Sequence, residues 1–239
     1  GNASRARSSN WKEGYGYTVA TEMYSAGIDR LTHQPLSFSV SETTEGVHIH
    51  IIDAELMGKG EKEKKDLYIE GVQNNGIINH YEYIINSEGT IEIRHVLKPE
   101  GKMPLWFPRI GLTLTVSDAL DQVKWYGRGP QENYPDRKTG YPMGIYASTV
   151  QAMYEPYLMP QDYGLRTDVR WLQLTTHKGI GLQFKMNEWF NFNIYPYSTD
   201  NLTKAMYTYQ LQKQKGMTLN LDYATTGVGC TARGVFGAY

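Results

Sequence analysis

Cysteine is almost absent from this sequence. The one cysteine, Cys230, cannot form an internal disulfide, so no disulfide scaffold is expected and the redox compartment is left open between cytoplasm and periplasm. No apolar run approaches the roughly 20 residues of a membrane span. The first residues are small, polar and basic, without the pattern of a signal peptide. We therefore expect a soluble protein with no membrane partner.

An excess of charge of one sign is also lacking. Lysine and arginine total 24, aspartate and glutamate total 25, and the formal net charge is −1. A nucleic acid or an anionic membrane surface would favour a strongly basic protein. The composition therefore gives no reason to expect nucleic acid as a partner.

Long amphipathic helices are missing as well. A (β/α)8 barrel needs roughly 200 residues or more of alternating strand and helix, and nothing in the 239 residues has that pattern. The charge run Gly60–Asp66 has no apolar stripe and is interpreted as a loop. Ser198–Ala205 is expected to form one helical turn, because Ser198 is a good N-cap. Chemistry that depends on a barrel is therefore not expected in this chain.

Short runs of alternating apolar and polar residues dominate the sequence. They have the period of two that marks a half-buried strand, and glycine- and asparagine-rich turn signals separate them. The clearest runs cover residues 47–51, 91–95, 110–116 and 190–194. Many short strands at this spacing indicate an all-β sandwich or barrel. No linker or repeat interrupts the pattern, so we expect one domain over residues 1–239.

The stretch Trp125–Lys138 concentrates aromatic and charged residues in one loop. Such a loop is ordered only if its polar groups pair with one another or with a ligand. In the first interpretation, Glu132, Asn133 and Arg137 bind sugar hydroxyls while Trp125 or Tyr134 stacks on the ring. In the second, Glu132 or Asp136 forms a buried ion-pair network with Arg128 or Arg137. Residue spacing alone leaves both open.

The same stretch resembles a motif of the last domain of large bacterial β-galactosidases, glycoside hydrolase family 2. The motif reads Gly-Pro-Gln-Glu-Asn-Tyr-Pro-Asp-Arg, and here it spans residues 129–137. Further resemblances follow in the family's order over residues 10 to 235: Pro108–Leu112, Tyr154–Gln161, Gly164–Trp171, Asn193–Ser198 and Leu221–Gly229.

The resemblance implies a two-sheet β-supersandwich similar to galactose mutarotase. It also implies that the catalytic glutamates of the retaining enzyme lie in a central barrel outside this chain. We accordingly expect no catalytic residue, metal or cofactor here, whereas the parent enzyme is expected to use magnesium and sodium. The expected partners are the preceding domains of a parent β-galactosidase, its galactoside and a second copy in a homo-oligomer. The chain is expected to be a fragment.

Five residues are the candidates for contact with substrate: Glu132, Asn133, Tyr134, Arg137 and Arg233. The family places a substrate-stacking tryptophan after a late Gly-x-Gly, but residues 227–234 contain none. The stacking role therefore cannot be transferred, and Arg233 or Tyr239 is the substitute that the sequence offers.

Other chemically active side chains have simpler interpretations. His48 and His50 fall on one face of a strand, yet no third metal ligand is apparent in the sequence. Asp162 and Asp168 are expected to cap or to pair with Arg166 and Arg170. Cys230 lacks a partner histidine, and His177 falls in a turn.

These features support a domain of a β-galactosidase that completes the substrate cleft without catalytic groups of its own. One alternative is an aldose 1-epimerase-like mutarotase, in which His95 or His177 acts with Glu132 or Asp168. The other alternative is a free-standing carbohydrate-binding module.

Overall fold

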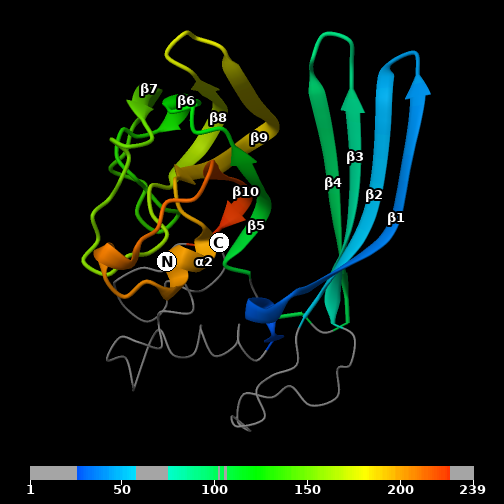
Figure 1. The fold of residues 1–239 in the computed structure, drawn as a ribbon, viewed down its shortest axis with the longest axis horizontal. Helices are drawn as coiled ribbons and strands as arrows, with labels where there is room; N and C mark the ends of the chain where they lie inside the picture. Colours follow the sequence, from blue (N-terminus) through cyan, green and yellow to red (C-terminus); the bar gives the residue numbers. More distant parts are fainter. Residues whose placement is uncertain (1–25, 58–74, 102, 105–106, 227–239) are drawn as a thin grey trace, which may run out of the picture. The chain divides into compact units, whose positions relative to one another are not determined.

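In the computed structural model, which describes residues 26–57, 75–101, 103–104 and 107–226, the chain is almost entirely β-structure in two antiparallel sheets (Figure 1). The all-β, two-sheet prediction is confirmed. The described residues fall into two compact units, divided between residues 106 and 107. The extent of a single domain over residues 1–239 stays a prediction.

The first unit contains a four-stranded meander in the order β1-β2-β3-β4. Its strands are β1 (Thr32–Thr43), β2 (Gly46–Leu56), β3 (Gly76–Ile85) and β4 (Ile91–Glu100). A two-residue turn joins β1 to β2, and Gly46 there has a φ of 138° while the carbonyl of Ile85 occupies the space of a Cβ. Only glycine fits that position.

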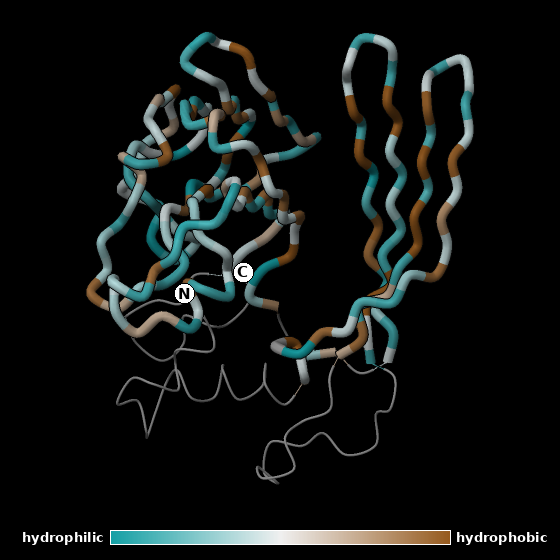
Figure 2. The backbone as a smooth tube through the Cα atoms, viewed as in Figure 1, coloured by the Kyte–Doolittle hydropathy of each residue, from teal (hydrophilic) through white to brown (hydrophobic). Residues whose placement is uncertain are grey.

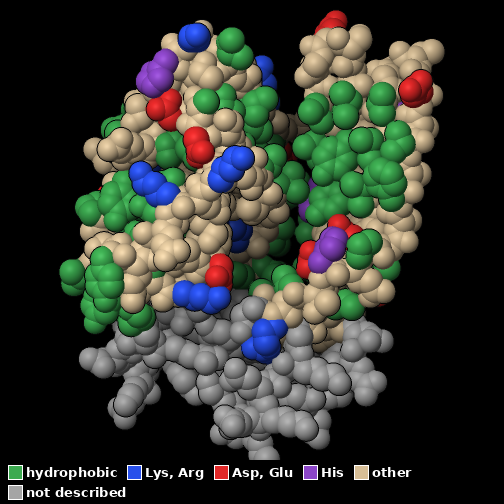
Figure 3. All heavy atoms as spheres, viewed as in Figure 1, with side chains coloured by type: hydrophobic (Ala, Val, Ile, Leu, Met, Phe, Trp, Pro, Cys, Tyr) green, Lys and Arg blue, Asp and Glu red, His purple; other side chains and the backbone are tan. Residues whose placement is uncertain are grey.

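Hydrophobic and hydrophilic residues alternate along these strands, as Figure 2 shows. The register pairs Phe38 with Ile51 and Ile51 with Tyr81, and paired residues of an antiparallel sheet point to the same face. Much of this apolar face is exposed: Phe38 is 68% exposed and Ile93 37%. Figure 3 shows hydrophobic side chains gathered on the visible surface of this sheet.

The second unit contains a six-stranded sheet in the order β5-β10-β9-β8-β6-β7. The strands are β5 (Arg109–Val116), β6 (Gln122–Arg128), β7 (Met143–Thr149), β8 (Arg166–Thr175), β9 (Gly181–Tyr195) and β10 (Met217–Thr225). The pairing of β8 with β9 is irregular between Arg166 and Trp171. Asp168 lies in this irregular stretch with a φ of +55°, which is uncommon for a residue with a side chain.

The core of this unit is apolar and closely enclosed. Trp125, Leu172, Phe190, Phe192 and Leu219 are each at most 1% exposed and belong to one cluster. Beside it, Tyr163, Tyr195 and Leu202 form a second cluster. Asn191 and Asn193, which alternation would place on a solvent-facing side of β9, are buried too. Strand β9 is therefore enclosed on both faces near its end, not half-buried as the sequence pattern predicts.

Helices are few and short in the described chain. They are η2 (Ile28–Arg30), α2 (Thr199–Lys204) and η4 (Thr208–Gln210). Ser198 caps α2 by accepting a hydrogen bond from the Asn201 amide at 3.0 Å, which confirms the predicted helical turn. No described helix has the length and hydrophobicity needed to cross a membrane. The charge run Gly60–Asp66 lies outside the described residues.

Candidate functional site

The motif loop begins where β6 ends. Trp125, near that end, is buried in the core, and its indole N–H donates to the Arg128 carbonyl at 3.1 Å. A short bridge within the loop pairs Tyr134 with Arg137, whose amide donates to the Tyr134 carbonyl at 2.9 Å. Because Trp125 is only 1% exposed, its ring offers no face on which a sugar can stack.

Glu132 is the centre of the loop's hydrogen bonding. Its buried carboxylate accepts from the Gly164 amide at 2.8 Å and from the Tyr134 hydroxyl at 3.3 Å. The Tyr157 hydroxyl and the Arg137 guanidinium donate to its other oxygen. Burial and the negative charge of Glu132 raise the pKa of Tyr134, and burial and the hydrogen bond to Glu132 raise that of Tyr157. Both phenols therefore stay protonated and act as donors.

Asn133 is fully buried and satisfied within the chain. Its side-chain oxygen accepts from the amide of Thr167 at 3.1 Å and from the hydroxyl of Thr167 at 2.5 Å. Its side-chain nitrogen donates to the Gln131 carbonyl at 3.0 Å, and its amide donates to the Leu165 carbonyl at 2.8 Å. These bonds join the loop to the start of β8 and leave no group directed to solvent.

Asp168 connects β8 to both ends of the loop. Its carboxylate lies 2.5 Å from Arg128 Nε and 3.0 Å from Lys138 Nζ. Burial raises the pKa of Asp168, but the hydrogen bonds from Arg128 and Lys138 lower it more, so the net shift is downward. Asp168 is therefore ionised at neutral pH, and the sequence prediction that pairs it with Arg166 or Arg170 is wrong.

Arg166 and Arg170 were the expected partners of Asp162 and Asp168. Their guanidinium groups face aromatic rings instead. The guanidinium of Arg166 lies 5.3 Å from the ring centroid of Trp125, and that of Arg170 lies 4.6 Å from Trp189. Arg166 also donates to the Gly164 carbonyl at 2.9 Å. Cation–π contact and a carbonyl acceptor replace the predicted ion pairs.

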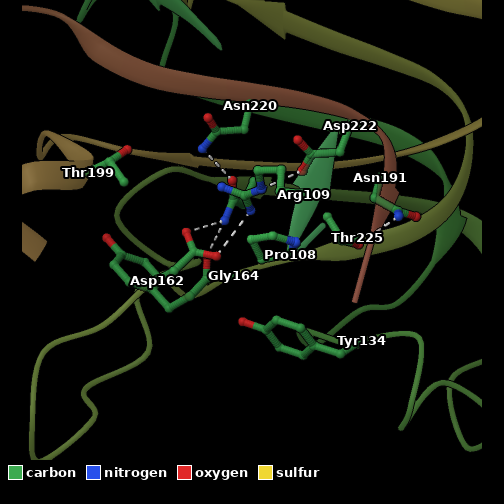
Figure 4. Close-up of polar contacts among 12 residues, drawn as sticks. Pro108, Arg109, Tyr134, Asp162, Gly164, Asn191, Thr199, Asn220, Asp222 and Thr225 are labelled. Carbon is green, nitrogen blue, oxygen red and sulfur yellow. Dashed lines mark hydrogen bonds and ion pairs between the residues drawn. The ribbon is translucent and has the colours of Figure 1, made fainter. Parts of the chain in front are cut away.

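A second polar network surrounds Arg109 at the start of β5 (Figure 4). Arg109 lies between two carboxylates, 3.0 Å from Asp162 through Nη2 and 3.0 Å from Asp222 through Nε, the latter an ion pair without hydrogen-bond geometry. Asn193 donates to Asp162 at 2.8 Å, and Asn220 donates to Asn193 at 2.8 Å. The prediction that Asp162 pairs with Arg166 or Arg170 is also wrong.

Two carboxylates share one guanidinium in this network. Burial raises the pKa of Asp222 to about 7. The positive charge of Arg109 lowers this pKa, and the negative charge of Asp162 raises it further. Burial lowers the pKa of Arg109, but the two carboxylates raise it more, so Arg109 stays charged. Sequence reasoning missed this network, and the available signal was the asparagines among the apolar residues of β9 and β10.

Of the predicted contact residues, the structure brings Glu132, Asn133, Tyr134 and Arg137 together in one loop. The side chain of Arg137 is 47% exposed, whereas Glu132, Asn133 and Tyr134 are buried. Arg233, Tyr239, Cys230 and the stretch 227–234 lie outside the described residues. His177 is in the turn between β8 and β9, 79% exposed and 3.5 Å from Asp121.

Comparison with known proteins places this sequence in a family. The model of the β-galactosidase small chain matches residues 3–235. The chain belongs to the β-galactosidase small-chain family. It is 37% identical over 147 residues to a β-galactosidase of Priestia megaterium, a match that covers 62% of this chain. It is 31% identical over 207 residues to a β-galactosidase of Vibrio cholerae, a match that covers 86% of this chain.

The matches cover only part of each relative. The small-chain segment corresponds to 14% of the Priestia protein and 18% of the Vibrio protein. The matched segment is therefore one portion of much larger β-galactosidases. The networks of Glu132, Asp168 and Arg109 all lie within residues that the small-chain family model matches.

Proposed function

We propose that this chain is a non-catalytic domain of a larger β-galactosidase, in which it completes the substrate cleft and stabilises the assembly. The whole enzyme would hydrolyse terminal β-D-galactosides. The preceding domains of that enzyme would be the partners of this chain. Family membership and the small share of each relative that the chain covers support this role. The observation that carries it is the pairing of the Glu132 and Asp168 carboxylates with cations of the same chain.

A retaining glycosidase needs two carboxyl groups about 5–5.5 Å apart, one of them a proton donor with a raised pKa. Glu132 is bound by a guanidinium and three further donors. Asp168 has a lowered pKa. Asp222 has a raised pKa, but it is 1% exposed, so a glycosidic oxygen cannot reach it. These three carboxyls suit a structural role better than an acid–base role.

Arg137 is the predicted contact residue of the loop whose side chain is exposed. Arg137 uses Nη2 to bind Glu132 and is half exposed, so its outer N–H groups can donate to a sugar hydroxyl. Glu132, fixed by its other donors, holds this guanidinium in place. We therefore assign Arg137 the contact with galactoside and assign Glu132, Asn133 and Tyr134 the positioning of the loop.

The test compares hydrolysis of a nitrophenyl galactoside by the purified chain and by a reconstituted enzyme. We expect no hydrolysis by the chain alone. Adding it to a Priestia megaterium β-galactosidase that lacks the matching segment should restore hydrolysis. A reconstituted enzyme with Arg137→Ala should show a higher KM than one with the matched control Arg94→Ala. Hydrolysis by the chain alone would contradict the proposal.

A free-standing carbohydrate-binding module is supported by a different observation. Tyr207, the N-cap of η4, and Tyr209, within η4, are exposed, and their rings are stacked with centroids 5.5 Å apart and planes 8° apart. Exposed aromatic faces suit the C–H faces of a pyranose. Binding of galactose by the chain alone that is lost in Tyr209→Ala would favour this module.

The mutarotase alternative has its own test. His95 stacks on Tyr81 with ring centroids 4.2 Å apart, and His177 pairs with Asp121, whereas Glu132 and Asp168 pair with cations. Polarimetry of α-galactose with the purified chain should therefore show the buffer rate. Acceleration that is lost in His177→Gln would establish a mutarotase instead.

A further inference from the structure

Two histidines and a glutamate meet on one face of the four-stranded sheet. His48 and His50 are two residues apart on β2, so both side chains point to the same face. On β3, Glu82 lies directly opposite His50 in the antiparallel register. The third ligand that the sequence did not reveal is thus supplied by the neighbouring strand, 32 positions further along the chain than His50.

The three side chains converge on one carboxylate oxygen. Glu82 Oε1 lies 3.9 Å from His48 Nδ1 and 3.8 Å from His50 Nε2. One ligand atom from each residue lies within 4.8 Å of the others. Bonds of about 2.0–2.2 Å to a tetrahedral zinc ion put the ligand atoms roughly 3.4 Å apart. A small inward movement of these partly exposed side chains therefore gives coordination distances.

The surrounding groups suit a metal site. Glu82 Oε2 accepts from Arg94 Nη1 at 3.1 Å, which orients the carboxylate and leaves Oε1 toward the histidines. His48 Nε2 is buried without a hydrogen bond, and the Glu45 carboxylate lies 3.9 Å from it. A histidine that binds metal through one nitrogen usually donates its other N–H to a carboxylate or carbonyl. Glu45 is placed to accept that hydrogen bond.

We propose that His48, His50 and Glu82 form a site for a divalent transition metal of the zinc class. Two imidazoles and one carboxylate suit zinc and its neighbours, whereas magnesium prefers oxygen ligands alone. Three protein ligands leave a position open to water or another small ligand. The positive charge of Arg94 opposes a cation, so the affinity is expected to be lower than in a closed four-ligand site. The bound ion would link β2 to β3.

The test is calorimetric titration of zinc into the purified chain, with cobalt absorption as an independent report of the ligand geometry. The background carries Cys230→Ser, so that the thiol cannot bind the metal. We expect one equivalent to bind, and we expect His50→Gln and Glu82→Gln each to weaken binding by at least about 10-fold. The matched controls are His80→Gln, two residues before Glu82 on β3, and the exposed His177→Gln. Both controls should bind as the background chain does.

Circular dichroism separates loss of the site from loss of the fold. His50 is half exposed, so His50→Gln should keep the spectrum of the background chain. If either variant misfolds, the other decides the outcome. The proposal is overturned if the chain binds no zinc, if His50→Gln and Glu82→Gln bind it unchanged, or if the control histidines weaken binding equally.

Discussion

The two sheets bury their polar side chains to different extents, and among the described residues of the four-stranded sheet only Asp53 and Asn79 are buried polar side chains. In the unit of the six-stranded sheet, Asn133 and Asn193 are buried and hydrogen-bonded to other protein groups, and Asp222 is buried and ion-paired with Arg109. In the four-stranded sheet, His50 and Arg94 are at least half exposed on one face, and apolar residues such as Phe38 are exposed on the other face. The dense charges of residues 125–138 therefore belong to a structural network. The His-x-His pattern on β2, by contrast, places the His50 side chain on an exposed surface.

The largest expected difference between the sheets comes from one substitution made in each. Phe192→Ala on β9 should lower the free energy of unfolding by about 3–5 kcal/mol, because its ring is fully buried. Phe38→Ala on β1 should cost about 1 kcal/mol or less, since the ring is 68% exposed. Urea denaturation followed by circular dichroism measures both. Equal losses would mean that the apolar face of the four-stranded sheet is covered in solution.

The second difference concerns pH. The pKa of Asp222 is raised to about 7 in the folded chain, so between an unfolded value of about 3.9 and that pH the folded state holds a proton that the unfolded state releases. Its stabilising contribution is therefore complete at low pH and is lost as pH rises through about 7. Asp222→Asn should accordingly gain stability relative to the unmodified chain as pH rises, by at most about 1.4 kcal/mol per pH unit.

Unfolding midpoints at a series of pH values measure this difference directly. The control is Asp200→Asn, an exposed residue that pairs with Lys204 on α2. The difference in unfolding midpoint between this control and the unmodified chain should vary less with pH than the difference for Asp222→Asn. Parallel curves for Asp222→Asn and the unmodified chain would show that Asp222 is ionised throughout and that Arg109 balances both carboxylates.

The sequence predicted the elements because their signals are local. The strands around residues 47–51, 91–95 and 110–116 need only a period of two, and α2 needs only the cap at Ser198. The family motif likewise placed four of the predicted contact residues in one loop. Neither prediction depended on which strands become neighbours.

Sequence reasoning assigned the partners of Asp162 and Asp168 wrongly, whereas the pair of Glu132 with Arg137, which it kept as one interpretation, is present. Arg128 pairs with Asp168, 40 residues away, and Arg109 pairs with Asp162, 53 residues away. The first contact follows from the pairing of β6 with β8, and the second joins the start of β5 to the connection before β8. Glu82 meets His50 for the same reason, because the β2–β3 register decides it. Spacing along the chain favours nearby arginines, whereas the sheets bring together residues that are far apart in sequence.

The smallest difference compares one arginine from each sheet. Arg137→Ala should lower the free energy of unfolding by about 1–3 kcal/mol, because the buried carboxylate of Glu132 loses its cation but keeps its other donors. Arg94→Ala should change stability little, because its pairs with Glu82 and Glu92 are on the exposed surface. Thermal unfolding of both variants measures the effect.

The Arg137 result also separates the two roles assigned to the loop. A loss of stability in Arg137→Ala that Arg137→Lys restores in part would show that the positive charge holds the loop. If Arg137→Ala keeps the melting temperature of the unmodified chain, the Glu132 pair contributes nothing to the fold. A raised KM in the reconstituted enzyme would then assign the guanidinium to the galactoside alone. The Arg137 side chain is about half exposed and also pairs with Glu132. We therefore expect the substitution to change both stability and KM.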